Sequence, residues 1–218
     1  MTSKTSDGPA AGRGYYGHER PDVLELVPAS ARDVLDCGCG EGWLGEQLRR
    51  RGCRVTGIEL HPAAAEVAAR RLDRVLAGNL EACVPALSAG SFDCVVCADV
   101  LEHLVDPWQV VGELKRVLRP RGALVCSVPN IRYVSVVVDL LVRGRWTYRE
   151  EGVLDRTHLR FFTRRTFAEF LTGAGFEIDV TQPNVRQFPA WFQPFSFLLR
   201  LVCPELRVVQ WRVRAFKP

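Results

Sequence analysis

The chain has 218 residues, a length that fits one domain with a full-sized core. Its hydrophobic content of 47% and charged content of 25% are ordinary for a globular protein. The net charge of +4 comes mainly from arginine, since lysine occurs only at Lys4, Lys115 and Lys217. Arginine in place of lysine, with many Ala, Val and Gly residues, is typical of a GC-rich genome, so we expect no nucleic-acid partner.

The eight cysteines do not indicate a disulfide framework, because several lie inside apolar runs. Cys94 and Cys97 form a C-x-x-C in an expected strand, where residues three apart point to opposite faces, so we expect no shared metal ion. A reduced, cytoplasmic setting follows. No apolar run reaches the about 18 residues of a membrane span. The polar N-terminus does not resemble a signal peptide.

In chain order, residues 1–14 are small, polar and glycine-rich, and we expect a disordered tail. From Arg20 onward, short apolar runs alternate with amphipathic stretches, which is typical of a parallel α/β sheet. Strands that are apolar on both faces indicate a sheet covered by helices on each side. They are expected at residues 33–36, 54–59, 74–77, 92–98 and 123–128.

Helices are expected between these strands, at residues 63–71 behind Pro62 and at 108–118 behind an Asp106 cap. Three glycines stand where helix C-caps belong, namely Gly52, Gly122 and Gly175. After the fifth strand come a helix at 164–173, a strand at 176–181 and a final strand at 208–216.

The alternation breaks at residues 129–162, where a helix-like piece at 134–142 precedes an arginine-rich, aromatic loop. Such a long excursion within a compact domain is usually functional, and we expect a lid-like insertion. The apolar stretch 188–202 has three open interpretations: a core-packing helix, a wall of the acceptor pocket, or a dimer or membrane-surface contact.

A glycine-rich turn follows the first strand, in the run Asp36-Cys37-Gly38-Cys39-Gly40-Glu41-Gly42. Glycines between a strand and a helix let a ligand approach the backbone closely. The spacing differs from the G-x-G-x-x-G that holds a pyrophosphate, which disfavours a nicotinamide oxidoreductase. An acid at the end of the strand suits a cationic ligand better.

Further segments follow in order: Glu59 at the end of the second strand, Gly78-Asn79-Leu80 after the third, and Asp99-Val100-Leu101-Glu102-His103 after the fourth. Tyr15-Tyr16 and Arg20 precede them. Together with the glycine turn, these segments resemble the class I S-adenosylmethionine-dependent methyltransferases. The resemblance implies a Rossmann-like α/β fold with a seven-stranded, mostly parallel sheet, helices on both faces and an antiparallel last strand. It also implies one methyltransferase domain over residues 15–218.

The same resemblance implies S-adenosylmethionine as cofactor, with S-adenosylhomocysteine as product and no metal. It places the methionine half at the glycine turn, the ribose at Glu59 and the adenine near Asn79. The residues expected to bind the cofactor are Tyr16, Arg20, Asp36, Gly38, Cys39, Gly40, Glu59, Leu60, Asn79, Leu80 and Asp99.

Two later segments, Ser127-Val128-Pro129-Asn130 and the run from Leu154 to Thr163, narrow the resemblance. They are similar to a bacterial subgroup found around sugar, cell-surface and natural-product pathways, with a weaker likeness to homoserine-pathway and quinone methyltransferases. This implies methylation of a sugar or secondary-metabolite hydroxyl. N-methylation of an amine and a non-catalytic, partner-dependent subunit remain alternatives, and a homodimer is possible.

An oxygen acceptor benefits from a base with a pKa near neutrality, which favours histidine. His103 follows the fourth strand, where ligands bind in open α/β sheets, and His158 lies in the expected lid. We expect His158, ahead of His103, to be the base. The alternatives are structural: a hydrogen bond of His103 within its turn, and pairing of His158 with Asp155 as a lid anchor.

The expected lid and its flanks are rich in arginine. One interpretation is a solvated basic face, and the other is a lid that recognises an anionic small-molecule acceptor, since arginine binds anions through two hydrogen bonds. The residues are Arg132, Arg143, Arg145, Arg149, Arg156, Arg160, Arg164 and Arg165.

Overall fold

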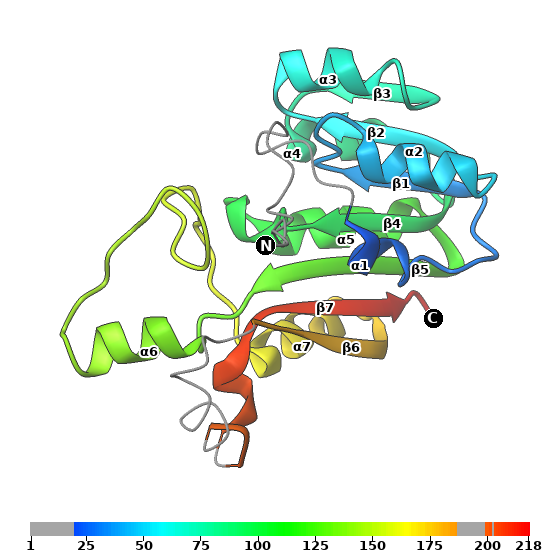
Figure 1. The fold of residues 1–218 in the computed structure, drawn as a ribbon. Coiled ribbons are helices and arrows are strands. Elements are labelled where there is room, and N and C mark those ends of the chain that lie inside the picture. Colours follow the sequence, from blue (N-terminus) through cyan, green and yellow to red (C-terminus); the bar gives the residue numbers. More distant parts are fainter. Residues whose placement is uncertain (1–19, 187–198, 202) are drawn as a thin grey trace, which may run out of the picture.

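The computed structural model describes residues 20–186, 199–201 and 203–218. The expected tail at 1–14, Tyr16 and most of the apolar stretch 188–202 lie outside these residues. The seven strands form one sheet in the order β3-β2-β1-β4-β5-β7-β6 (Figure 1). Their bounds are β1 Asp33–Cys37, β2 Arg54–Glu59, β3 Arg74–Ala77, β4 Phe92–Ala98, β5 Leu118–Pro129, β6 Glu177–Val185 and β7 Val208–Phe216.

The strands β1 to β5 pair in parallel, whereas β7 runs antiparallel to both of its neighbours, β5 and β6. The predicted Rossmann-like, mostly parallel sheet with an antiparallel last strand is therefore confirmed. Because parallel strands all point the same way, the ends of β1, β2, β4 and β5 meet at one edge of the sheet. Ligands bind at this edge in open α/β folds.

Two apolar clusters form the core, one on each face of the sheet. β4 supplies both, with Val95 and Cys97 in one cluster and Cys94 and Val96 in the other, so the C-x-x-C sulfurs do face opposite sides. Helices α5 and α7 cover the first cluster, and α1, α2 and α3 the second. The helices are α1 Pro21–Leu24, α2 Trp43–Arg50, α3 Pro62–Ala68, α4 Leu80–Cys83, α5 Pro107–Val117, α6 Val134–Leu141 and α7 Arg164–Gly173.

Local capping signals hold at most of the predicted places. The Asp106 carboxylate accepts a hydrogen bond from the backbone N–H of Gln109 at the start of α5. Gly52 and Gly175 take positive φ angles just beyond α2 and α7. The prediction of a helix C-cap at Gly122 was wrong, because α5 ends at Val117 and buried Leu118 already pairs with β4.

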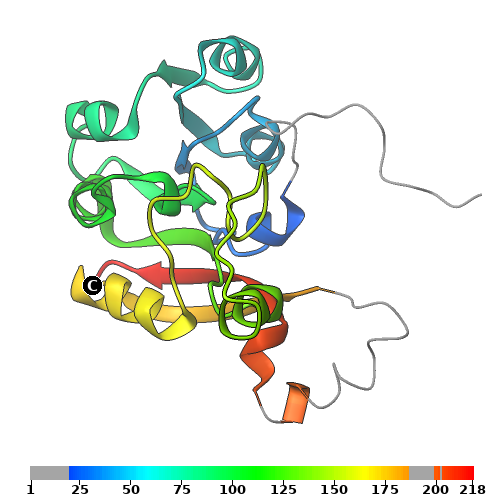
Figure 2. The same cartoon turned by 90° about the vertical axis from the view of Figure 1, so that its left-hand side faces the viewer.

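The excursion between β5 and α7 consists of α6 and a long loop. The loop passes in front of the edge where the parallel strands end (Figure 2). The two ends of the excursion meet at an isolated bridge between Asn130 and Phe162. The side chain of Asn130 is fully buried, and its amide donates to the carbonyl oxygens of Glu205 and Val208 at 2.9 and 2.8 Å.

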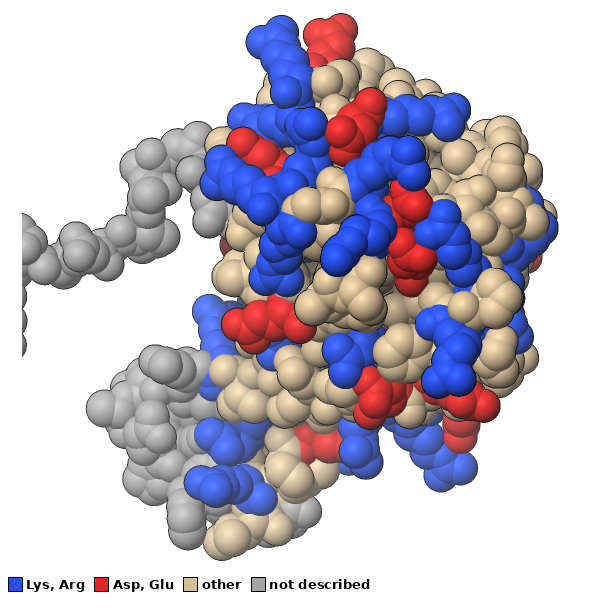
Figure 3. Space-filling view, turned by 90° about the vertical axis from the view of Figure 1, so that its right-hand side faces the viewer, with Lys and Arg blue, Asp and Glu red and all other residues tan. Residues whose placement is uncertain are grey.

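Arginine and acidic side chains are interspersed on the face toward the start of the parallel strands (Figure 3). There Arg119 pairs with both Asp33 and Asp93, at 2.9 and 2.5 Å, and Arg54 also pairs with Asp33. Much of the basic excess on this face is therefore held in ion pairs. Among the described residues, no helix is both long enough and apolar enough to cross a bilayer.

Replacing Asn130 with alanine is expected to lower the free energy of unfolding by about 2–4 kcal/mol, because a buried and a part-buried carbonyl oxygen lose their donor. Asn184→Ala is the matched control, since its amide makes one long contact of 3.4 Å with Gln210. We expect the control to change stability by about 1 kcal/mol or less. Urea denaturation measures both, and equal losses would contradict the role given to Asn130.

Candidate active site

The glycine turn after β1 folds tightly against β2. Gly38, Gly40 and Gly42 all take positive φ angles, of 68°, 55° and 83°. A Cβ atom at Gly38 would lie 2.7 Å from Cγ2 of Val100. The backbone N–H groups of Gly38 and Cys39 both donate to the carbonyl oxygen of Ile58, at 2.8 and 3.1 Å. The turn therefore accepts no side chain at Gly38 and offers backbone for close approach.

Two buried carboxyl groups flank this turn, Asp36 at the end of β1 and Glu59 at the end of β2. Each oxygen of Glu59 accepts a backbone N–H at 2.8 Å, one from Gly40 and one from His61. Oδ2 of Asp36 is buried and has no hydrogen-bond partner among the described residues. Burial, reinforced by the nearby charge of Glu59 and opposed by Arg20, raises the pKa of Asp36 to about 7.

A polar network lies at the ends of β4, β5 and β7, centred on Asp99, which has a positive φ of 57°. The Asp99 carboxylate accepts hydrogen bonds from Arg20, from the Ser127 hydroxyl at 2.9 Å and from the Gln210 amide. Arg20 also pairs with Asp22 at 3.2 Å. The structure thus places Arg20 and Asp99, both predicted as site residues, in direct contact. Ser127 and Gln210 were not predicted, although a serine ending an apolar strand was an available signal.

The other predicted cofactor residues divide by exposure. Leu60, directly after β2, is 67% exposed. Asn79 is also exposed. Its side-chain oxygen accepts a hydrogen bond from the backbone N–H of Glu81 and so caps the start of α4. The side chains of Cys39 and Leu80 are buried in the two core clusters, and burial raises the pKa of the Cys39 thiol. Only their backbones are placed to contact a ligand.

His103 and His158 come together from distant parts of the sequence. Their ring centroids lie 4.7 Å apart in an edge-on arrangement. His103 ends the short helix η2 (Leu101–His103), and His158 is buried in the loop of the excursion. The two histidines that the sequence offered as candidate bases therefore lie in the same site.

The backbone fixes the tautomer of each ring. Nδ1 of His158 lies 3.0 Å from the carbonyl oxygen of Val153, and Nδ1 of His103 lies 3.3 Å from that of Thr157. A carbonyl oxygen only accepts, so Nδ1 is the donor in both rings, and in the neutral form of each ring the lone pair is on Nε2. Nδ1 of His103 also lies 3.0 Å from the hydroxyl oxygen of Thr157. Burial, together with the neighbouring His158, lowers the pKa of His103, which keeps this ring neutral at pH 7.

The alternative in which the side chain of His158 pairs with Asp155 is not what the structure shows. The carboxylate of Asp155 instead accepts from the backbone N–H and hydroxyl of Thr157, at 2.8 and 2.6 Å. The tight Asp155–Thr157 turn leaves the histidine ring to the carbonyl of Val153. Asp155 thus shapes the turn that carries His158, and does not orient the ring directly.

Glu102 is a site residue that sequence reasoning did not single out, although its segment was recognised. It is 1% exposed, and both carboxyl oxygens have no hydrogen-bond partner among the described residues. Burial, reinforced by Asp99, raises its pKa well above the usual range. Its backbone carbonyl accepts from Leu159 and Arg160 at 2.8 and 3.0 Å, which ties the loop to η2.

A cavity of about 220 Å³ is lined by Asp99, Glu102, His103 and His158. One ligating atom each from Glu102, His103 and His158 lies within 4.8 Å of the others. A carboxylate and two imidazoles are also suitable ligands for a divalent cation. The arrangement is therefore chemically able to move a proton or to hold a metal ion.

A larger cavity of about 470 Å³ adjoins the first, between α6 and the loop. The two cavities share Glu151, Gly152, Val153 and Val209 in their walls. Arg149 and Arg186 line the larger cavity, whereas no lysine or arginine is among the described residues that line the smaller one. The site thus has a small compartment beside the histidines and a roomier, charged one beyond it.

Residues 13–181 match the family described as "Methyltransferase domain". This match covers more than half of the chain and agrees with the sheet order and the glycine turn. The chain belongs to the class I S-adenosylmethionine-dependent methyltransferase family. The cofactor of this methyltransferase is accordingly S-adenosylmethionine.

Curated relatives include the "Ubiquinone biosynthesis O-methyltransferase" of Xanthomonas axonopodis pv. citri, 41% identical over 71% of this chain and 66% of the relative. The protein of the same name from Psychrobacter cryohalolentis is 34% identical over 77% of this chain and 63% of its own length. The methyltransferase thus spans less than two thirds of these relatives. A Thermotoga maritima structure titled as a possible histamine N-methyltransferase shares the fold, with a TM-score of 0.66, 22% identity and coverage of 93% and 89%.

If Asp36 binds the cationic part of the cofactor, affinity must depend on pH. A cationic ligand stabilises the ionised carboxylate, so the association constant for S-adenosylmethionine is expected to rise through the pKa of about 7 and to level off above it. Binding near neutral pH should release protons. Calorimetry in buffers of different ionisation enthalpy measures this release.

The matched control is Asp36→Asn, which keeps the shape of the side chain and removes the titration. We expect this variant to bind more weakly at alkaline pH and to show neither the pH dependence nor the proton release. A wild-type affinity that is constant between pH about 6 and about 8 would contradict the assignment.

Proposed function

We propose that this methyltransferase transfers the methyl group of S-adenosylmethionine to a hydroxyl group of a small molecule. The observation that carries the proposal is the pair of imidazoles in the cavity beside the network of Asp99, each with Nδ1 held by a backbone carbonyl so that Nε2 is the nitrogen left to accept a proton. A free lone pair is the requirement for taking a hydroxyl proton. The curated relatives are named as O-methyltransferases, which supports oxygen as the acceptor atom.

The cofactor would lie across the ends of β1, β2 and β4. The unpartnered oxygen of Asp36 suits the ammonium group of the methionine part, and the glycine turn suits its close approach. Each oxygen of Glu59 accepts only one backbone N–H and keeps a further lone pair, which suits the two ribose hydroxyls. These features of the turn, Asp36 and Glu59 support their assignment to the cofactor.

The remaining cofactor contacts extend to both sides. Exposed Leu60 offers an apolar surface for the adenine ring. In the neighbouring turn, the side-chain nitrogen of Asn79 has no hydrogen bond among the described residues, since only its side-chain oxygen is bonded. Arg20, already paired with Asp22 and Asp99, would take the cofactor carboxylate as a further partner. Tyr16 lies outside the described residues and stays a prediction.

S-adenosylmethionine supplies a methyl group on a positively charged sulfur. Nε2 of His158 accepts the acceptor's hydroxyl proton as the new oxygen–carbon bond forms and the carbon–sulfur bond breaks. His103 holds the second lone pair of the cavity and can accept a hydrogen bond from the same hydroxyl or a neighbouring one. Glu102, whose pKa is raised well above its usual range by burial, lies in the wall of the same cavity.

The small cavity is lined by acidic residues and by no lysine or arginine that the structure describes, so it disfavours an anionic acceptor end. The acids are Asp99, Glu102, Glu151 and Asp155. The larger cavity contains Arg149 and Arg186 but also three acids, Asp139, Glu150 and Glu151, so its lining does not favour the anionic acceptor that the arginine-rich loop suggested. Most of the loop arginines pair with acids, as Arg143 does with Asp139 and Arg156 with Glu150, which favours the solvated basic face for them.

The sugar or secondary-metabolite acceptor, the cytoplasmic location and the homodimer all stay predictions. A direct test is a product assay with S-adenosylmethionine and matched acceptors: phenols, catechols, sugars and their amine counterparts. The proposal expects methyl transfer to hydroxyl compounds. Transfer only to amines would contradict it, and tight S-adenosylhomocysteine binding without any transfer would favour a non-catalytic subunit.

Removing the base should reduce turnover without affecting cofactor binding. We expect His158→Ala to lower kcat by about 10²–10⁴, with S-adenosylhomocysteine affinity unchanged. His103→Ala is the comparison, with a smaller loss expected because His158 keeps its lone pair. Unchanged turnover in His158→Ala would contradict the base assignment.

A chelator separates the two chemistries open to this cluster. Proton transfer by His158 needs no metal, so dialysis against EDTA is expected to leave kcat unchanged. A loss of activity that a divalent cation restores would instead assign Glu102, His103 and His158 as metal ligands.

A further inference from the structure

The end of α6 exposes a run of large apolar side chains that nothing in the described chain covers. Leu140, Leu141 and Val142 are 46%, 76% and 78% exposed. Trp146 and Tyr148, in the loop that follows, are 39% and 51% exposed. We refer to these five residues, together with Arg143 and Arg145, as the α6 tip. Consecutive exposed apolar residues are rare on soluble surfaces unless they serve a contact.

The start of α6 is anchored, whereas its end is not. Val134 and Val136 are buried and pack with Val153 and Leu154 in a small apolar cluster. The helix then carries its last turn away from the sheet, so that the α6 tip is the part of the excursion farthest from the body (Figure 1). A helix that is anchored at its start and exposes apolar side chains at its far end is suited to inserting that end into an apolar medium.

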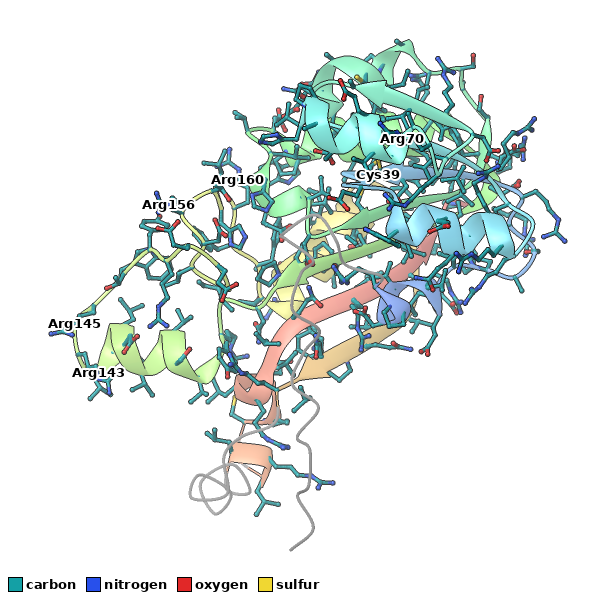
Figure 4. All side chains as sticks on the ribbon, turned by 45° about the horizontal axis from the view of Figure 1, so that its top comes forward. Cys39, Arg70, Arg143, Arg145, Arg156 and Arg160 are labelled. Carbon is teal, nitrogen blue, oxygen red and sulfur yellow. The ribbon has the colours of Figure 1, made fainter. Side chains whose placement is uncertain are left out.

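The α6 tip is basic as well as apolar. Arg143 and Arg145 project at its end (Figure 4). Arg143 pairs with Asp139, whereas the side chain of Arg145 has no partner among the residues the structure describes. Asp139 is also shared with Arg149 at 3.5 Å, so two arginines divide one acid. A net positive charge therefore surrounds the apolar side chains.

We propose that the α6 tip docks on an anionic lipid surface. Leucine and valine side chains enter the acyl boundary, while tryptophan and tyrosine, with an apolar ring and a polar atom, suit the headgroup level. Arginine beside them is attracted by anionic headgroups. The ring of Trp146 packs edge-on against the ring of Phe161, with the ring centroids 5.4 Å apart, and this contact holds the Trp146 ring in place in the loop. This docking is independent of the acceptor's identity.

The test is co-sedimentation of the full chain with vesicles. We expect binding to vesicles that contain phosphatidylglycerol, weaker binding to pure phosphatidylcholine, and a decrease at high salt. The double variant Leu141→Asp with Val142→Asp should lower the partition coefficient about tenfold or more. Arg145→Ala should lower it about fivefold at low salt only.

Val105→Asp is the matched control, since Val105 is 67% exposed but lies outside the α6 tip. It should bind vesicles like the wild type, and S-adenosylhomocysteine calorimetry verifies that each variant is folded. Equal vesicle binding by the wild type and the double variant would overturn the proposal. So would a wild-type dimer in analytical ultracentrifugation that the double variant dissociates without any vesicle binding, since a second copy would then cover the α6 tip.

Discussion

The hydrogen bond from the Gly40 N–H to the Glu59 carboxylate joins β1 and β2 at the sheet edge where we propose that the cofactor binds. It fixes the glycine turn of β1 against the end of β2, while the second oxygen of Glu59 holds the start of α3 through His61. Because the bond lies in a buried setting, the carboxylate stays in place without a cationic partner. The same burial leaves neighbouring Asp36 with an unpartnered oxygen and a raised pKa. One interaction thus positions the turn and sets the electrostatics of the site.

Most of the sheet was predictable from sequence because local signals agree with the fold. Strands apolar on both faces indicate a covered parallel sheet, and the bounds of β2, β3, β4 and β7 follow the predicted ones. The error at Gly122 arose because a glycine after a helix usually ends it, whereas here Leu118 is already paired with β4. A pairing partner distant in sequence leaves no local signal.

The candidate site likewise contains residues that the sequence could predict and residues that it could not. Asp36, Glu59 and the glycines were predictable, since their chemistry depends on position at a strand end. The meeting of His103 with His158 was not, because it depends on the path of a long loop. Nor was the role of Glu102, whose carboxyl is distinctive only through its burial, a property of the folded chain. The sequence also could not show that the carboxylate of Asp155 bonds to Thr157 and not to the ring of His158.

The bridge between Asn130 and Phe162 has a consequence for how such an enzyme diversifies. Because the excursion leaves and re-enters the body at adjacent points, insertions or deletions within it need not disturb β5 or α7. The α6 tip, His158 and most of the wall of the larger cavity belong to this segment, whereas the glycine turn, Asp36 and Glu59 belong to the sheet. Recombination at these two neighbouring residues would therefore replace the α6 tip and this part of the cavity wall together, and leave the glycine turn as it is.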